Sequence, residues 1–385
     1  MTLYSLKLTL KTSIGKLAMV GIFLLNVTSN TFASTVHSLT LPLTFEYESN
    51  VQLSASDEQP VSRVILAPNY SITANQGTEQ WSAIASLRIE QSSDETISQN
   101  RNDPSLNLGW THDYETGQFG VTALLNNQST RVSEFTDSGI VSGDNTRETR
   151  SASINWLNNL TDRTSLTLNG AATSVVFEGL VTTGLVDYRN NLISVKLEYV
   201  LNEQVDIFSQ YSFSGYNPES VNGTESDTES VDLGLTWSVT EKFNVTGSVG
   251  VNQTKSENNT LTSVNESWQA LLNMQYTTLR ANSNLNLSRS LSPGNTGSLN
   301  ETNQITVAWR YNLSEKDDLA LNYNWGQNLT QNKTETQLFS LNYTRQISLS
   351  WDFRLSAIHR VRDDRLTRAS SSSAMAGIIY RLPDF

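Results

Sequence analysis

Hydrophobic and polar residues alternate with a period of two along most of this chain. In the clearest window Val231, Leu233, Leu235, Trp237 and Val239 alternate with Asp232, Gly234, Thr236 and Ser238. Successive side chains of a β-strand point to opposite faces, whereas a helix would spread these apolar residues around its axis. The pattern therefore predicts strands with one apolar face and one polar face.

The same alternation recurs in about 18 windows, from Leu43–Leu53 to Ala374–Leu382. Short turns join some of them, and long polar links join the others. The short turns include Glu115–Gln118, Asn202–Gln204 and Thr240–Lys242, and the long links include Arg131–Glu148, Asn217–Glu229, Thr254–Glu266 and Leu291–Glu301. This alternation is typical of a transmembrane antiparallel up-and-down β-barrel. We expect an all-β fold of about 18 strands (16–20), with short periplasmic turns and long extracellular loops.

Aromatic residues provide an independent indication. In a membrane barrel, lipid-facing Trp and Tyr gather at the level of the lipid headgroups. In this chain Trp and Tyr recur near one end of the predicted strands, at the apolar positions of the alternation. The predicted girdle is Trp110, Trp156, Tyr199, Trp237, Tyr276, Trp309, Tyr311, Tyr343 and Tyr380. A soluble β-solenoid or a stack of β-sandwiches is the alternative, but neither requires such a ring.

The first 33 residues predict a cleaved secretory signal peptide. Three lysines precede the apolar run Leu17–Val27, and the small-residue site Thr31–Ala33 follows. Eleven apolar residues are too few for a transmembrane helix, which needs about 20. We therefore expect export to the outer membrane of a Gram-negative cell, with residues 34–385 forming a single barrel domain.

Composition narrows the function classes. Three of the 26 basic residues lie before Ser34, which leaves 23 basic against 38 acidic residues, a net charge of −15. This excess of acidic residues argues against nucleic acid as a partner, because a nucleic-acid binder neutralises phosphates with basic patches. The chain has no cysteine, so disulfides do not stabilise it. Its 8 Trp, 13 Tyr and 12 Phe argue against a disordered chain.

Taken together, the signal peptide, the alternation and the closing segment resemble the outer-membrane β-barrel superfamily of Gram-negative bacteria. The resemblance covers residues 39–385. Two runs, Ser288–Gly294 and Tyr188–Asn190, also resemble uncharacterised barrels of exopolysaccharide and exosortase (PEP-CTERM) loci. The superfamily resemblance implies insertion by the barrel-assembly machinery among outer-membrane lipid and lipopolysaccharide. The second resemblance implies polysaccharide export or envelope assembly, and it offers no catalytic residues to carry over.

The C-terminal residues agree with that superfamily in one respect and differ from it in another. Barrels of this kind usually end in an aromatic residue on the final strand, and Phe385 ends this chain. However, Ile378, Tyr380 and Leu382 would point to one face of the strand and Phe385 to the other. Pro383 also has no N–H to donate to the neighbouring strand. We expect the last strand to stop near Leu382.

The residues at the polar positions of the alternating strands predict an aqueous lumen. The predicted lining is Glu46, Glu48, Asp232, Arg280, Asn282, Asn284, Asn286, Arg310, Asn322, Asn324, Asp352, Arg354 and Arg381. Closure pairs the first strand with the last. We expect Glu46 to pair with Arg381 or Arg354 across that seam, with independently solvated charges as the alternative.

Candidate catalytic chemistry is sparse. The three histidines are His37, His112 and His359, and none has a persuasive Ser or Asp partner in the sequence. A protease at the outer rim could use His359 with Asp363 or Asp364. Glu225, Asp227 and Glu229 could bind Ca²⁺ or bridge lipopolysaccharide, but they match no calcium-loop motif and suit a solvated loop. We expect no enzyme activity, no cofactor and no metal site.

Three functions remain open. A barrel of 16–18 strands is wide enough for an aqueous path, so a passive channel for small hydrophilic solutes is the leading hypothesis. The alternatives are an outer-membrane component of exopolysaccharide export or assembly, and a non-transporting barrel whose loops bind partners.

Overall fold

The computed structural model describes residues 34–137, 144–179, 184–220, 223–258, 262–329, 333–364 and 366–382. Both the predicted signal peptide, residues 1–33, and Phe385 lie outside the described residues. The elements are β1 (Ser34–Glu48), β2 (Val61–Leu66), β3 (Asn69–Gln76), β4 (Glu79–Ser92), β5 (Arg101–Tyr114), β6 (Gly117–Ser129), α2 (Thr130–Asp137), β7 (Thr146–Thr161), β8 (Thr164–Glu178), β9 (Tyr188–Asn202), β10 (Val205–Pro218), β11 (Glu225–Thr240), β12 (Phe243–Glu257), β13 (Thr262–Thr277), β14 (Ala281–Pro293), β15 (Leu299–Asn312), β16 (Asp317–Asn328), β17 (Glu335–Gln346), β18 (Trp351–Asp363) and β19 (Arg368–Leu382).

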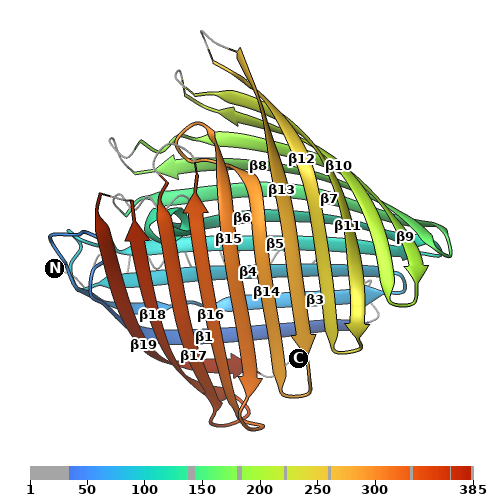
Figure 1. Cartoon of the computed structure of the whole chain (residues 1–385). Coiled ribbons are helices and arrows are strands. Elements are labelled where there is room, and N and C mark those ends of the chain that lie inside the picture. Colours follow the sequence, from blue (N-terminus) through green and yellow to red (C-terminus); the bar gives the residue numbers. More distant parts are fainter. Residues whose placement is uncertain are drawn as a thin grey trace.

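The strands form one antiparallel sheet that closes on itself (Figure 1). Consecutive strands pair along the sequence, and β1 pairs with β19 from Leu39 opposite Leu382 to Glu48 opposite Ser373. Because β2 and β3 both lie between β1 and β4, the 19 strands make an 18-stranded barrel, as predicted. Closure leaves no free edge, and it excludes both the solenoid and the stack of sandwiches.

The second strand of the barrel is interrupted. The sequence predicts one strand over Val64–Thr73, but Ala67 and Pro68 separate β2 from β3. Pro68 has no N–H to donate to the ladder. Its carbonyl still accepts a hydrogen bond from Leu87 N at 3.1 Å, and Ala67 N donates to the Pro42 carbonyl at 3.0 Å. The sheet therefore stays joined across the break.

The two rims of the barrel differ. At one rim, here called the turn rim, consecutive strands are joined by turns of two to four residues, and β1 begins and β19 ends there. The predicted turns at Glu115–Gln118, Asn202–Gln204 and Thr240–Lys242 are confirmed, each with two residues between its strands. The opposite rim, here called the loop rim, carries the other connections, including residues 49–60 and α2.

Several strands continue into segments that the sequence predicts as loops. β11 begins at Glu225 rather than Val231, and β12 continues to Glu257, so most of the predicted links Asn217–Glu229 and Thr254–Glu266 is strand. Beyond the apolar zone both faces of a strand are polar, and the alternation that marks a strand in the sequence disappears. The last strand reaches Leu382, the last residue that the structure describes, so its end near Leu382 stays a prediction.

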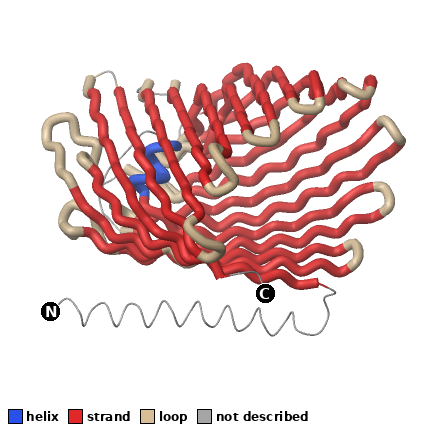
Figure 2. The backbone as a smooth tube through the Cα atoms, turned by 90° about the horizontal axis from the view of Figure 1, so that it is seen from below, coloured by secondary structure: helices blue, strands red, loops and turns tan. Residues whose placement is uncertain are grey.

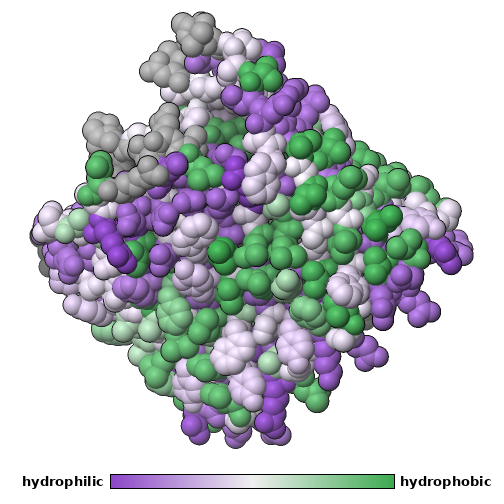
Figure 3. All heavy atoms as spheres, viewed as in Figure 1, coloured by the Kyte–Doolittle hydropathy of each residue, from purple (hydrophilic) through white to green (hydrophobic). Residues whose placement is uncertain are grey.

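The strands show the two faces that the alternation predicts. On β11, Leu233 is 63% exposed and Trp237 44%, whereas Asp232 between them is 8% exposed. Figure 3 shows one outer face of the barrel, with hydrophobic side chains across its middle and hydrophilic side chains toward its ends. The apolar side chains therefore cover the outside of the wall, and the polar ones turn inward.

The helix α2 follows β6 at the loop rim and lies inside the barrel wall (Figure 2). Among the described residues, no helix is long and apolar enough to cross a membrane.

Candidate functional site: a helix held across the lumen

The helix α2 begins where β6 and β7 leave the sheet. Thr130 N donates to the Asn145 carbonyl at 2.9 Å, and Asn145 N donates to Thr130 Oγ1 at 3.1 Å. These reciprocal bonds satisfy donors that a helix start would otherwise leave unpaired. They fix the start of α2 to the wall and direct the helix inward.

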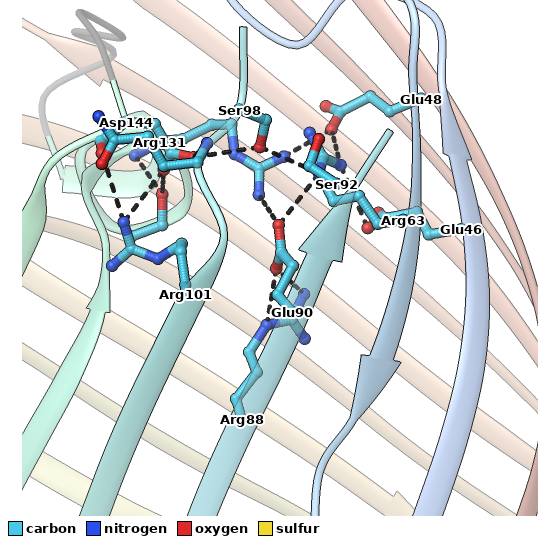
Figure 4. A network of polar contacts seen from close by, with 12 residues as sticks. Glu46, Glu48, Arg63, Arg88, Glu90, Ser92, Ser98, Arg101, Arg131 and Asp144 are labelled. Atoms are coloured by element: carbon cyan, nitrogen blue, oxygen red, sulfur yellow. Dashed lines mark hydrogen bonds and ion pairs between the residues drawn. The ribbon is translucent and has the colours of Figure 1, made fainter. Parts of the chain in front are cut away.

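A buried cluster of ionic groups surrounds the first turn of α2 (Figure 4). Glu48 at the end of β1 is its centre, because three arginines from three different elements reach that one carboxylate. The distances to Glu48 oxygens are 2.7 Å from Arg63 Nη1, 2.7 Å from Arg131 Nη1 and 3.0 Å from Arg360 Nη1. Ser371 Oγ donates to the same carboxylate at 3.2 Å. This single acid thus joins β2, α2 and β18.

Glu90 on β4 is the second acid of the cluster. Its carboxylate lies 3.0 Å from Arg63 Nε, 3.3 Å from Arg131 Nη2 and 2.8 Å from Arg88 Nη2. Arg63 also reaches Glu46 at 3.2 Å, and its side chain is fully buried. We call Glu46, Glu48, Arg63, Arg88, Glu90, Arg131 and Arg360 the Glu48 cluster.

A second, smaller group of ionic contacts, made by Arg101 of β5, adjoins the Glu48 cluster. Arg101 binds Asp103 with two bonds of 3.0 Å, and its Nη1 lies 3.2 Å from Asp144 Oδ1. Ser98 Oγ links the two groups, since it accepts from Arg63 Nε at 3.2 Å and donates to Asp144 at 3.1 Å. The four arginines and three acids of the Glu48 cluster, with Arg101, Asp103 and Asp144, are balanced in charge.

That balance keeps Arg131 charged inside the protein. Burial opposes the charged guanidinium, but Glu48 and Glu90 outweigh it and hold the pKa of Arg131 above its ordinary value. Breaking a buried pair by removing one partner costs about 3–5 kcal/mol, because the other charge stays buried and uncompensated. The cluster therefore fixes α2 in one position.

The second half of α2 contacts other parts of the wall. Phe135 is 2% exposed and packs against Leu53, Ala369 and Leu338, which belong to the β1–β2 connection, β19 and β17. Glu134 lies 3.5 Å from Arg147 Nη1 and accepts a hydrogen bond from Asn295 Nδ2 in the β14–β15 connection. Since β6 and β17 are far apart around the barrel, α2 crosses the lumen and narrows it.

Two polar cavities lie along the inner wall. One has a volume of 340 Å³, and Arg147, Tyr188, Ser290, Thr302, Gln327 and Thr336 contribute to its lining. The other, which we call the vestibule, has a volume of 620 Å³ at the turn rim. Its charged lining residues are Arg310, Lys316, Arg354, Arg381, Glu315, Asp317, Asp318 and Asp352.

The predicted charged lining residues lie in the vestibule, in the Glu48 cluster and at two separate positions, Asp232 and Arg280. Arg310, Asp352, Arg354 and Arg381 come together in the vestibule, whereas Glu46 and Glu48 lie in the Glu48 cluster. Asp232 accepts two hydrogen bonds of 2.7 Å from Gln269 Nε2. Arg280 lies in the exposed turn before β14 rather than in a strand.

The asparagines that the sequence assigns to the lumen form rows across neighbouring strands. Asn286 is opposite Thr306, which is opposite Asn324, and Asn324 Nδ2 donates to Thr306 Oγ1 at 3.4 Å. Asn322 Nδ2 likewise donates to Ser340 Oγ at 3.4 Å. Asn282 and Asn284 point to the same face of β14 as Asn286. This part of the wall is thus polar but uncharged.

The predicted seam pair is wrong. Glu46 binds Arg63 on its other side, and Arg381 binds Asp352 instead. In the closing ladder Arg381 is opposite Thr40, six residues before Glu46, or about 20 Å along the strand. The prediction aligned the visible ends of the first and last alternating windows, but β1 begins nine residues earlier, at Ser34.

The predicted girdle residues all lie within five residues of the turn-rim ends of their strands, on the same parity as the outward apolar residues. Several contact another aromatic ring: the rings of Trp309 and Tyr311 stack with centroids 5.7 Å apart, and tilted pairs form between Trp81 and Trp110 at 5.6 Å and between Trp351 and Tyr380 at 5.0 Å. Tyr199, Trp237 and Tyr276 are each at least 40% exposed. Trp156 and Tyr343 occupy equivalent positions on β7 and β17.

The rim-protease hypothesis names His359 with Asp363 or Asp364, and all three lie near the loop-rim end of β18. His359 Nδ1 lies 2.9 Å from Ser372 Oγ, while Asp364 binds Arg362 and accepts hydrogen bonds from Thr367. Within the described ranges, no group of three or more His, Cys, Asp and Glu residues is arranged to hold a metal ion.

Comparison with known proteins supports the fold. No protein-family model matches the chain, and no curated protein matches it. Its backbone is similar to solved outer-membrane barrels. The outer membrane protein OpdK of Pseudomonas aeruginosa matches with a TM-score of 0.51 and 10% identity, over 92% of this chain and 100% of that one. A BenF-like porin from Pseudomonas fluorescens Pf-5 matches with a TM-score of 0.50 and 12% identity, over the same shares. At these identities the likeness establishes the fold alone, a closed antiparallel β-barrel like that of these proteins.

Proposed function

Because the chain has the fold of an outer-membrane porin, we propose that it is a passive channel for small hydrophilic solutes in the outer membrane. One observation carries the proposal: in the part of the chain that the structure describes, a closed 18-stranded wall with a polar inner face is narrowed by a short helix, and no folded domain fills it. Barrels of this size leave an aqueous passage. The aromatic residues near the turn rim then lie at the periplasmic headgroup level.

The path for a solute runs beside α2. The 340 Å³ cavity lies between Arg147, which α2 holds through Glu134, and the polar inner face of β14–β17. Apart from Arg147, the residues lining this cavity are uncharged, and most offer hydroxyl or amide groups. Such groups replace the hydrogen bonds that a sugar or another hydroxylated solute makes with water. The chemistry suits small uncharged polar solutes.

Ion selectivity is expected to be weak. The vestibule has four basic and four acidic lining residues, so its field largely cancels at a distance. The arginines of the Glu48 cluster are bound to carboxylates, and all except Arg88 are buried, so they do not offer a free site to an anion. The cluster holds the helix and does not act as a filter.

Planar-bilayer recording of the purified, folded chain tests this function. We expect steady ion currents that rise linearly with voltage, with a reversal potential near zero in a salt gradient. A folded barrel that inserts but never conducts would refute the channel and favour the non-transporting surface barrel.

A further inference from the structure

Two arginines lie on the outer surface of the barrel in one row across three strands. Arg150 on β7 is opposite Ser174 on β8, and Ser174 is opposite Arg189 on β9. Adjacent strands are about 4.8 Å apart, so the two arginine Cα atoms are separated by roughly 10 Å, with one small side chain between them. Both side chains are largely exposed, at 64% and 67%.

Arg189 lies near the outer limit of the apolar band. Arg189 is ten residues from the girdle residue Tyr199 on the same strand, in the direction of the loop rim. A rise of about 3.4 Å per residue and a tilt of 35–45° place it about 24–28 Å above Tyr199 along the barrel axis. The outward apolar band of such barrels is about 25 Å tall. Arg189 is therefore at the headgroup level of the outer leaflet.

Arg150 lies lower, six residues from the girdle residue Trp156 on its strand, and its long side chain contacts an acid nearer the loop rim. It binds Glu148, which is two residues nearer the loop rim on the same face. Arg189 binds Glu219 at 2.8 Å, beyond the end of β10. Exposed pairs of this kind contribute about 0–1 kcal/mol each, so a multiply charged anion can replace or share them.

An apolar groove of 430 Å³ continues from the two arginines toward the membrane centre. Leu106, Leu108, Leu125, Ala152 and Ala172 line it, together with Arg150 and Arg189. The small residues Ala152 and Ala172 face each other across β7 and β8, so the wall is hollow between the larger leucines. A groove of this shape accommodates a hydrocarbon chain, and the arginines stand at its polar end.

We propose that this surface is a binding site for a phosphorylated, multiply acylated glycolipid of the outer leaflet. Guanidinium groups bind phosphate with charge-assisted, bidentate hydrogen bonds, and two of them about 10 Å apart can clasp one phosphorylated headgroup. One acyl chain lies in the groove below. The site is on the outside of the wall, so it is independent of the proposed channel.

Native mass spectrometry of the full-length chain, reconstituted with defined lipids, tests the site. The probes are bisphosphorylated lipid A, the same lipid A without its phosphates, and phosphatidylglycerol. We expect the protein to retain bisphosphorylated lipid A at least tenfold better than either of the others. Equal retention with and without phosphates would overturn the role of the arginines, and equal retention of phosphatidylglycerol would show a general anion site.

Variants assign the binding to this surface. The double variant Arg150→Ala/Arg189→Ala is expected to lose retention at least tenfold, and Ser174→Asp to do the same by placing a carboxylate between the arginines. Lys255→Ala is the matched control, because Lys255 binds Glu257 two residues away on β12 and is likewise exposed. All variants should keep wild-type conductance, which separates a failure of this site from a failure of the channel. Unchanged retention in the double variant would refute the proposal.

Discussion

Replacing Arg131 by alanine should release α2 from the wall and widen the channel. Arg131 binds Glu48 at 2.7 Å and Glu90 at 3.3 Å, and its side chain is 4% exposed. Hydrogen bonds to charged groups are worth about 1.5–3 kcal/mol each, and breaking a buried pair costs about 3–5 kcal/mol. Glu48 would keep Arg63 and Arg360, which limits the loss to the lower half of that range. About 3 kcal/mol raises the undocked population of α2 roughly a hundredfold.

The assay combines a position reporter with conductance. The chain has no cysteine, so Ser133→Cys introduces a single thiol at a position that is 4% exposed. We expect slow labelling of this thiol alone, and labelling roughly a hundredfold faster when Arg131→Ala is added, with larger or more frequent conductance steps. Arg131→Lys should lie between them, and Lys255→Ala should leave both readouts unchanged.

Two results would refute this reasoning in different ways. Unchanged thiol labelling in Arg131→Ala would mean that the Glu48 cluster does not hold α2. Faster labelling without any change in conductance would mean that α2 moves but does not narrow the path.

Three further predictions address the core, the faces and the field of the barrel. Phe135→Ala should remove packing against Leu53, Leu338 and Ala369 worth about 3–5 kcal/mol and accelerate labelling of the Ser133→Cys thiol, with unchanged labelling as the contrary result. Leu233→Arg should destabilise folding into vesicles by about 2–4 kcal/mol, and the inward Thr236→Arg by clearly less, as measured by urea titration. A larger loss for Thr236→Arg would reverse our assignment of the two faces. Arg354→Glu changes the vestibule by two charges toward negative and should shift the reversal potential toward cation preference, and an unshifted potential would place Arg354 off the ion path.

The sequence predicts the wall of the barrel well, because a strand between lipid and water must alternate. The two faces of β11 and the strand number follow directly from that constraint. The same constraint is absent above the membrane, where both faces meet water, and the strand extensions at Glu225–Ser230 could not be recognised. Register fails for another reason: β1 begins at Ser34, nine residues before the window that the sequence marks, and this shift displaced the predicted partner of Glu46.

The helix across the lumen could not be predicted from alternation. Residues 130–137 read as part of a polar link, and a helix of two turns carries little periodic signal of its own. The sequence assigns Glu46 and Glu48 to the lumen, but the partners that bind them lie on β2, α2 and β18, far apart in sequence. One signal in the sequence points to the cluster: Arg63 and Glu90 stand at the polar, inward positions of their strands. A charge buried there requires a partner of opposite charge. Phe135, a lone aromatic residue in a polar link, was a second.

The most direct test of the channel is solute entry into vesicles that contain the purified, folded chain. Swelling is followed by light scattering with uncharged sugars of increasing mass as the only osmolytes. The structure predicts rapid swelling with monosaccharides, slower swelling with larger sugars, and faster entry of the larger ones in Arg131→Ala. Folded vesicle-inserted protein that admits no sugar of any size would contradict the account.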